Sequence, residues 1–95
     1  MEGVKHDKGK APMHLLLIEV PKASVRLSEA LSYGEGKYGR GNWRNVPEGS
    51  DRYLAATLRH LTAHASGEKV DDESGLSHLA HAAANIMFLL DAESA

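Results

Sequence analysis

The 95-residue sequence contains no cysteine, one tryptophan and one phenylalanine. The absence of cysteine excludes disulfide bonds and thiolate metal ligands, and it fits a reducing compartment, so we expect a cytoplasmic protein. Long apolar runs are also missing: LLLI at 15–18 and IMFLL at 86–90 are far too short to cross a bilayer. The N-terminus carries mixed charges and does not have the pattern of a signal peptide. The sequence therefore predicts a chain without a membrane partner.

A strong charge of either sign is absent as well, since the net charge is −2 at pH 7 with histidine neutral. We therefore expect no long nucleic acid as a partner. The charge is nevertheless uneven: residues 1–52 contain nine Lys or Arg and seven Asp or Glu, and residues 53–95 contain two and six. A basic segment beside an acidic, histidine-rich segment suits an anionic ligand held together with a metal ion. Chance segregation of charge in a short chain is the alternative explanation.

Helical periodicity dominates what is present, and the pattern predicts an all-α fold. We expect a small single domain over 1–95, with a C-terminal antiparallel helix hairpin, a Gly-rich basic and aromatic loop, and an extended N-terminal arm. LLLIEV at 15–20 is interpreted as apolar packing that leads into a helix, or as a short strand. A chain this short buries little apolar surface, so we expect a homo-oligomer. The predicted segments are an arm at 1–14, a helix at 21–33, a loop at 34–49, a helix at 51–66 and a helix at 73–91.

Gly34 is expected to end the first of these helices, and Asp72 to cap the last. Apolar residues at helical spacing predict the buried faces of the last two helices. In the helix at 51–66 they form a heptad-like seam of Leu54, Leu58, Leu61 and Ala65. In the helix at 73–91 they are Leu76, Leu79, Ala80, Ala83, Ile86, Met87 and Leu90.

Polar residues share one face of the last predicted helix, where His78, His81 and Asn85 stand at i, i+3 and i+7. His60 and His64 are i, i+4 partners on the preceding helix. In an antiparallel hairpin joined by about six residues, His60 comes to lie opposite His81. By the same rule His64 lies opposite His78. Four histidines would then share one layer, with carboxylates of the turn beside them.

The four histidines are the candidate metal ligands of this sequence. Imidazole together with carboxylate suits a divalent transition metal such as Zn²⁺, Mn²⁺, Fe²⁺ or Ni²⁺, whereas all-oxygen sites suit Mg²⁺. An ion held there would activate water or bind phosphate oxygens. The alternative is that these imidazoles are structural hydrogen-bonding groups between the helices. The predicted ligands are His60, His64, His78 and His81, and the carboxylates at the turn are Glu68, Asp71 and Asp72.

The loop KYGRGNWR at 37–44 interleaves cations with aromatic rings and glycines. Arginine and lysine bind phosphates, aromatic faces stack on bases, and asparagine reads a base edge or a sugar hydroxyl. The alternative is that the aromatic side chains fill the small core while the cations stay in solvent. The arm adds two lysines, and the helix at 51–66 adds one arginine. The candidate nucleotide-binding residues are Lys8, Lys10, Lys37, Tyr38, Arg40, Asn42, Trp43, Arg44 and Arg59.

Four segments, in the order KHDKGKAP, YGEGKYGRGNWR, RYLAATLRHLTAHASGE and DDESGLSHLAHAAANIMFLL, resemble a small phage-associated family. That family is described as the dATP/dGTP diphosphohydrolase N-terminal domain, and the resemblance extends from Lys5 to Leu90. It implies an all-α fold, phosphate-rich purine nucleotides as ligands and loss of pyrophosphate as the reaction. By motif position it adds Asn85 to the nucleotide-binding candidates. The catalytic candidates are Glu68, Asp72 and Glu73.

The residues and the resemblance together predict metal-assisted hydrolysis of a purine (deoxy)nucleoside triphosphate to the monophosphate and pyrophosphate. The expected cofactor is a divalent metal, with Mn, Zn, Fe and Mg as the open alternatives. One alternative is a non-catalytic phage protein that binds a nucleotide and sequesters an immune signal, with the histidines as structural groups. Another is a purely structural helical oligomer, which would bind neither nucleotide nor metal.

Overall fold

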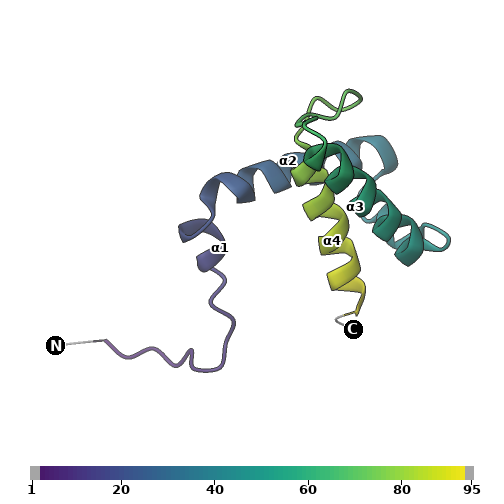
Figure 1. The fold of residues 1–95 in the computed structure, drawn as a ribbon. Coiled ribbons are helices and arrows are strands. Elements are labelled where there is room, and N and C mark those ends of the chain that lie inside the picture. The colour runs from purple at the N-terminus through teal and green to yellow at the C-terminus, as the bar shows by residue number, and fades with distance from the viewer. Residues whose placement is uncertain (1–2, 94–95) are drawn as a thin grey trace.

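The computed structural model describes residues 3–93, which fold into helices joined by loops (Figure 1). The helices are α1 Leu15–Ile18, α2 Pro21–Tyr38, the 3₁₀ helix η1 Asn42–Asn45, α3 Gly49–Ala65 and α4 His78–Glu93. α3 and α4 form the C-terminal antiparallel hairpin, and α2 packs against α4. The predicted all-α fold with a C-terminal helix pair is confirmed. None of the helices within residues 3–93 has both the length and the apolar character needed to cross a membrane.

The N-terminal region projects away from the helical body (Figure 1). Residues 3–14 form neither helix nor strand, as predicted for an arm at 1–14, of which residues 1–2 lie outside the described part of the chain. The apolar run at 15–18 forms α1, so the strand alternative is wrong. The hydroxyl of Ser24 in α2 donates a hydrogen bond to the carbonyl of Leu16. This contact helps to hold α1 against the first turns of α2.

α2 continues beyond Gly34, so the predicted end of this helix was wrong. It runs to Tyr38 and stops at Gly39, whose φ of 94° lies in the left-handed region that favours glycine. A glycine inside a helix costs about 1 kcal/mol but does not forbid the helix. The extra turn is held from outside, because Tyr33 and Lys37 both contact the carboxylate of Glu73. The irregular loop is therefore much shorter than the predicted 34–49, and η1 lies within it.

The connection from α3 to α4 runs over 66–77 and is about twice as long as predicted. The backbone N–H of Asp71 donates to the carbonyl of Leu76 at 2.8 Å, and that of His78 donates to Lys69 at 2.9 Å. These bonds close a small loop in which Gly75 has a φ of 74°, outside the helical region. α4 therefore begins at His78 and not at residue 73. Asp72 lies in this loop and does not cap the helix.

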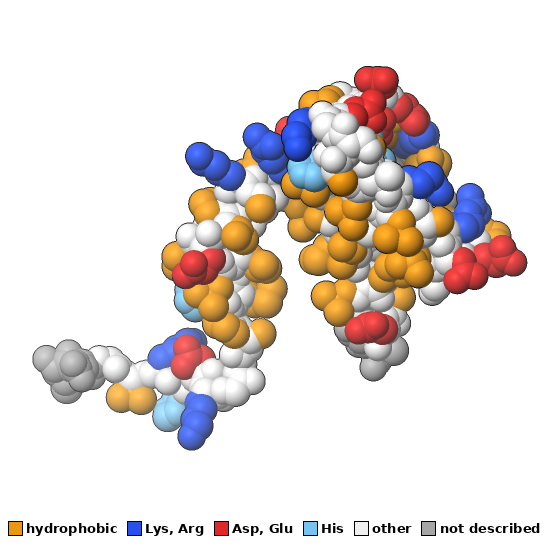
Figure 2. Space-filling view, in the orientation of Figure 1, with side chains coloured by type: hydrophobic (Ala, Val, Ile, Leu, Met, Phe, Trp, Pro, Cys, Tyr) orange, Lys and Arg blue, Asp and Glu red, His pale blue; other side chains and the backbone are white. Residues whose placement is uncertain are grey.

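The interior of the body is built from small and polar side chains, contrary to the predicted leucine seam. Ala82 is 2% exposed, whereas Leu58 is 56% exposed. The face of α3 that meets α4 is a stripe offset by one residue from the leucines, or about 100° around the helix. Figure 2 shows the hydrophobic side chains lying on the outside of the body. The buried residues are Ala30, Thr57, His78, Ala80, Ala82 and Ala84, and the predicted core residues found exposed are Leu54, Leu58, Leu61, Ala65, Leu79, Ile86, Met87 and Leu90.

Candidate functional site

Three histidines meet at the loop end of the hairpin. His60 comes from α3, and His78 and His81 come from the first turn of α4. The rings of His60 and His81 stack with centroids 4.9 Å apart and planes 18° apart. The rings of His60 and His78 have centroids 5.1 Å apart. The predicted convergence of His60 with His81 across the hairpin is confirmed.

A hydrogen-bonded series connects Glu68, His78 and His60. Nε2 of His78 lies 3.0 Å from Oε2 of Glu68, and Nδ1 of His78 lies 2.9 Å from Nδ1 of His60. A carboxylate only accepts hydrogen bonds, so in the neutral tautomer of His78 that fits this contact the proton is on Nε2. Nδ1 of His78 must then accept the Nδ1–H of His60. Nε2 of His60 is left with its lone pair, and no hydrogen bond among the described residues uses this atom.

His81 is fixed by a different set of groups. Its Nε2 lies 2.6 Å from Oγ of Ser74 and 3.6 Å from Oδ2 of Asp71. The serine and the carboxylate therefore meet the same ring nitrogen, whereas in a serine-hydrolase triad they contact opposite nitrogens. The side-chain amide of Asn85 donates to the backbone carbonyl of His81 at 3.0 Å. Ser74 and Asp71 thus orient the ring, and the contact gives no nucleophilic triad.

Burial lowers the pKa of His60, and the positive forms of neighbouring His81 and His78 lower it further. The pKa of His81 is also lowered by burial, although the carboxylate of Asp71 acts in the opposite direction. Both rings are therefore neutral near pH 7, and each keeps a nitrogen lone pair. Neutral imidazole is the form that accepts a proton from water.

The ammonium group of Lys37 lies beside this cluster because α2 extends to Tyr38, past its predicted end at residue 33. Lys37 forms an ion pair with Glu73, and the hydroxyl of Tyr33 donates to the same carboxylate at 3.3 Å. The hydrogen bond to Glu73 raises the pKa of Lys37, and the same bond lowers the pKa of Glu73. The Tyr33 ring also meets the ring of His81 edge-on, with centroids 5.8 Å apart. The end of α2 therefore brings a positive charge to the histidine cluster.

His64 does not join this cluster, so its predicted pairing with His78 was wrong. Both nitrogens of His78 are occupied by His60 and Glu68. Nδ1 of His64 is buried and has no hydrogen-bond partner among residues 3–93. Within the same part of the chain, no three His, Asp or Glu side chains are placed to hold one metal ion. The imidazoles of the cluster bond to each other and to the loop, and as placed they do not fit a metal ion.

Trp43, from the second half of the 37–44 segment, lies towards the opposite end of the hairpin. Trp43 stacks on Phe88 of α4 with centroids 4.7 Å apart, and the hydroxyl of Tyr53 donates to the carbonyl of Trp43 at 2.7 Å. The guanidinium of Arg44 lies 4.5 Å from the centroid of the Trp43 ring and 3.6 Å from the carboxylate of Asp91. A depression of about 280 Å³ borders these side chains. The packing alternative for Trp43 agrees with this arrangement, and stacking on a base stays a prediction.

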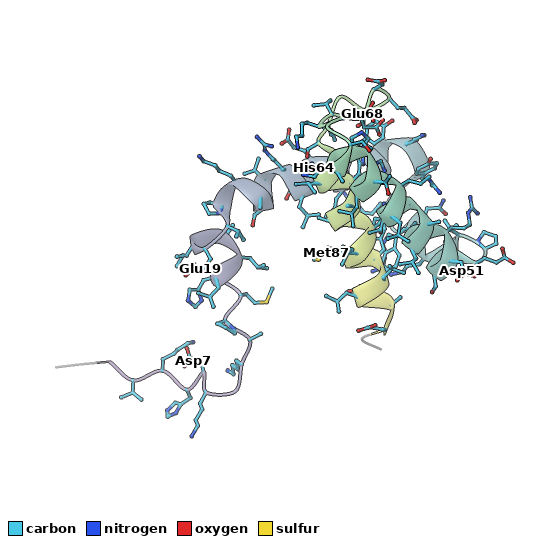
Figure 3. The ribbon with its side chains drawn as sticks, viewed as in Figure 1. Asp7, Glu19, Asp51, His64, Glu68 and Met87 are labelled. Carbon is cyan, nitrogen blue, oxygen red and sulfur yellow. The ribbon has the colours of Figure 1, made fainter. Side chains whose placement is uncertain are left out.

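The two predicted constellations are separated along the hairpin. His81 and Asp91 are ten residues apart in α4, which corresponds to about 15 Å along the helix. Figure 3 shows Glu68 at the loop end and Asp51 at the far end of α3. Only Lys37 of the predicted cations contacts the loop that carries the histidine partners, and Arg40 instead pairs with Glu35 at 3.1 Å. The other candidates lie exposed on the surface and are Lys8, Lys10, Tyr38, Asn42 and Arg59.

Two residues of the site were missed by sequence reasoning. The sequence pattern ends the helix at Tyr33 and gives no sign of its contact with Glu73. Ser74 was placed inside a helix, seven residues before His81, where the two side chains share a face but stand about two turns apart. The run of Asp, Glu, Ser and Gly at 71–75 was the signal for a loop in place of a helix start. Of the catalytic candidates, Glu68 and Glu73 have the contacts described above, and Asp72 is exposed.

The chain is similar to one described protein family and to a protein of a Salmonella phage. The family model described as "dATP/dGTP diphosphohydrolase, N-terminal" matches residues 1–95. A protein of Salmonella phage PMBT28 named dATP/dGTP diphosphohydrolase is 40% identical to this chain over 89 residues. That match covers 94% of this chain and 29% of the phage protein, so the chain spans less than a third of the length of this relative. No solved structure matches the chain.

Proposed function

The chain belongs to the dATP/dGTP diphosphohydrolase N-terminal family, and we propose that it hydrolyses a purine (deoxy)nucleoside triphosphate to the monophosphate and pyrophosphate. The observation that carries the proposal is the series from Nε2 of His60 through His78 to Glu68. This series ends in a neutral lone pair at one side and in a half-exposed carboxylate at the other. Such an arrangement accepts a proton from water and passes it towards solvent.

The proposed reaction begins with a water molecule placed between Nε2 of His60 and the α-phosphorus of the nucleotide. The water oxygen forms a bond to phosphorus, and the bond from phosphorus to the bridging oxygen of the β-phosphate breaks. Pyrophosphate leaves with the electron pair of that bond. The water proton goes to Nε2 of His60, while Nδ1–H of His60 moves to His78 and Nε2–H of His78 moves to Glu68. A positioned general base of this kind contributes about 10² to 10⁴ in rate.

The phosphate chain needs positive charge, and Lys37 is the proposed source. It lies at the end of α2, beside the loop that orients His81. Both side chains of its ion pair with Glu73 are exposed to solvent. Phosphate oxygens can therefore replace the carboxylate without leaving a buried charge. Charge-assisted hydrogen bonds to phosphate are the strong class of such contacts. Lys37 would therefore orient the nucleotide relative to His60.

The predicted metal assistance takes no part in these steps, because the described residues do not fit an ion as they are placed. An ion bound by His78 would have to displace either His60 or Glu68 from its nitrogens. The proposed general base needs the contacts of His78 with His60 and Glu68, whereas a metal ion bound by His78 would break one of them. Turnover in the presence of a chelator distinguishes the two.

The test is turnover of dGTP and dATP by the full chain, with products separated by anion exchange. We expect His60→Gln to lower kcat at least about 100-fold, because the lone pair that accepts the proton is lost. His64→Gln on the same helix is the matched control and should keep turnover. Circular dichroism checks that both variants are folded. Unchanged turnover in His60→Gln, or turnover abolished by chelator but not by this substitution, contradicts the proposal.

The non-catalytic alternative has one observation in its favour: the imidazoles already satisfy one another as structural hydrogen-bonding groups. A nucleotide-sequestering protein would bind dGTP, dATP or a cyclic dinucleotide and release it unchanged. Incubation followed by recovery of the intact ligand supports that alternative. Release of monophosphate and pyrophosphate supports hydrolysis.

A further inference from the structure

The molecule exposes more surface than a compact chain of its mass. Its accessible surface is 7537 Å² for 10.3 kDa, whereas a folded monomer of that mass exposes about 5,400 Å². Its radius of gyration is 16.2 Å, against about 12.4 Å for a compact domain of this length. A standard protein interface removes about 800 Å² from each partner. The excess is thus large enough to contain such an interface.

Two exposed apolar areas lie on α1 and α4, in addition to the exposed leucines of α3. The first is the α1 surface, in which Leu17 is 67% and Ile18 is 66% exposed, together with Leu16. The second is the α4 stripe, whose members follow helical spacing along one face of α4. Contiguous apolar patches on a monomer mark sites of interaction. The α4 stripe consists of Leu79, Ile86, Met87 and Leu90, which are 42–51% exposed.

The α1 surface does not reach the α4 stripe of its own chain. α1 sits at the start of α2, and α2 meets α4 further along, where Ala30 packs against Ala80 and Ala84. Pro21 and Ala30 are nine residues apart in one helix, or about 14 Å. Figure 1 shows α1 and the arm apart from α4. A continuous helix therefore holds the two apolar areas of one chain away from each other.

We propose that a second copy of this chain covers both areas, with α1 of each copy packed on the α4 stripe of the other. A two-fold arrangement makes this contact twice, so the two areas of each chain are buried together. Charge supports the pairing as well. The arm at 3–14 carries three lysines and one aspartate, so it is positively charged. α4 ends with Glu93 and with Asp91, which also lies 3.6 Å from Arg44 of its own chain. The proposal uses none of the residues of the histidine cluster and is independent of the proposed activity.

The absence of cysteine allows a direct test with the double variant Leu17→Cys, Met87→Cys. Under mild oxidation we expect a band of twice the chain mass on a non-reducing gel. The control Leu17→Cys, Ser66→Cys carries its second thiol at the loop end of α3 and should stay at the mass of one chain. A link formed within one chain, which keeps the monomer mass, would show that the arm folds onto its own α4 and overturns the proposal. Absence of any link overturns it as well.

Light scattering of the unmodified chain gives a second test, and the wild type should have the mass of two chains. Leu17→Asp places a charge in the proposed contact and should raise the dimer dissociation constant at least tenfold. Helix content should not change, because α1 lies outside the α3–α4 hairpin. A monomeric wild type, or a Leu17→Asp variant that associates as tightly as the wild type, contradicts the arrangement.

Discussion

At the loop end of the α3–α4 hairpin, imidazoles of the two helices meet one another and the carboxylates of the connecting loop, whereas three aromatic rings pack together at the other end. Trp43, Tyr53 and Phe88 lie with ring centroids 4.7–6.5 Å apart. Apolar and aromatic burial stabilises a fold directly. Buried polar groups add little to stability even when every one is paired. The comparison therefore assigns stability to the aromatic end and chemistry to the histidine end.

The division explains why the middle of the hairpin is made of alanine. Ala80 and Ala84 let α2 and α4 approach closely, and Ala82 is almost fully buried. Small side chains bury little apolar area, so they leave the aromatic end as the main source of stabilisation within one chain. Substitutions at the two ends should accordingly have different effects, and the largest should be on stability.

Trp43→Ala should lower the free energy of unfolding by about 3 kcal/mol, because it removes the ring that stacks on Phe88. Urea unfolding followed by circular dichroism measures the change. Tyr38→Ala is the matched control, since that ring is 62% exposed and should matter by less than about 0.5 kcal/mol. Equal effects of the two substitutions would show that the aromatic end does not hold the hairpin.

Sequence patterns predicted the hairpin and the meeting of His60 with His81, because helical spacing and chain reversal determine which residues face each other. They did not predict which stripe of α3 is buried. The leucines at 54, 58 and 61 mark an apolar face, but they do not say whether it meets the same chain or another one. The offset of one residue puts polar Thr57 inside and Leu58 outside.

The sequence pattern also did not predict the end of α2 or the start of α4, because contacts between distant parts of the chain determine both. The end of α2 depends on Glu73, which lies more than thirty residues away and ties down Tyr33 and Lys37. The start of α4 depends on backbone bonds between 69–71 and 76–78. Tertiary contacts of this kind override the intrinsic helix propensity of individual residues. The proton positions of the Glu68–His78–His60 series likewise follow only from distances between atoms.

At the histidine end, His78→Leu should separate stability from activity. The apolar side chain fills a buried position but leaves the Nδ1–H of His60 without its acceptor, so the free energy of unfolding should fall by about 1 to 2 kcal/mol. Turnover of dGTP should fall about 100-fold, because the proton path from His60 to Glu68 is interrupted. Urea unfolding and initial rates are measured on the same preparation. A stability loss as large as that of Trp43→Ala would show that the histidine end is structural.

The histidine end should also make stability depend on pH. In the unfolded chain an imidazole binds a proton near pH 6.5, whereas in the folded chain the pKa of His60 and His81 is lower. The unfolded state therefore binds more protons in the window just below that value. The contribution of these two histidines to the free energy of unfolding is complete above pH 6.5. It decreases as the pH falls from 6.5 towards the lower pKa values of the folded state, by at most about 1.4 kcal/mol per pH unit for each group.

Urea unfolding between pH 5 and pH 8 measures this slope, and His60→Gln should reduce it. Glu35 and Glu73, whose pKa values are lowered by Arg40 and Lys37, lose their contributions only at more acidic pH. The carboxylates are therefore separable from the histidines. A wild-type slope that His60→Gln leaves unchanged would remove His60 from the titrating groups.

The smallest effect concerns the cation at the histidine end. Lys37→Gln should raise the KM for dGTP about fivefold, which corresponds to about 1 kcal/mol of lost phosphate binding. Stability should hardly change, because the ion pair with Glu73 is exposed and such pairs contribute little. Lys22→Gln, on the same helix but far from the loop end, is the control for a general loss of positive charge. A rise in KM for both variants would indicate long-range attraction of the anionic nucleotide, whereas a rise for Lys37→Gln alone places the phosphates at the end of α2.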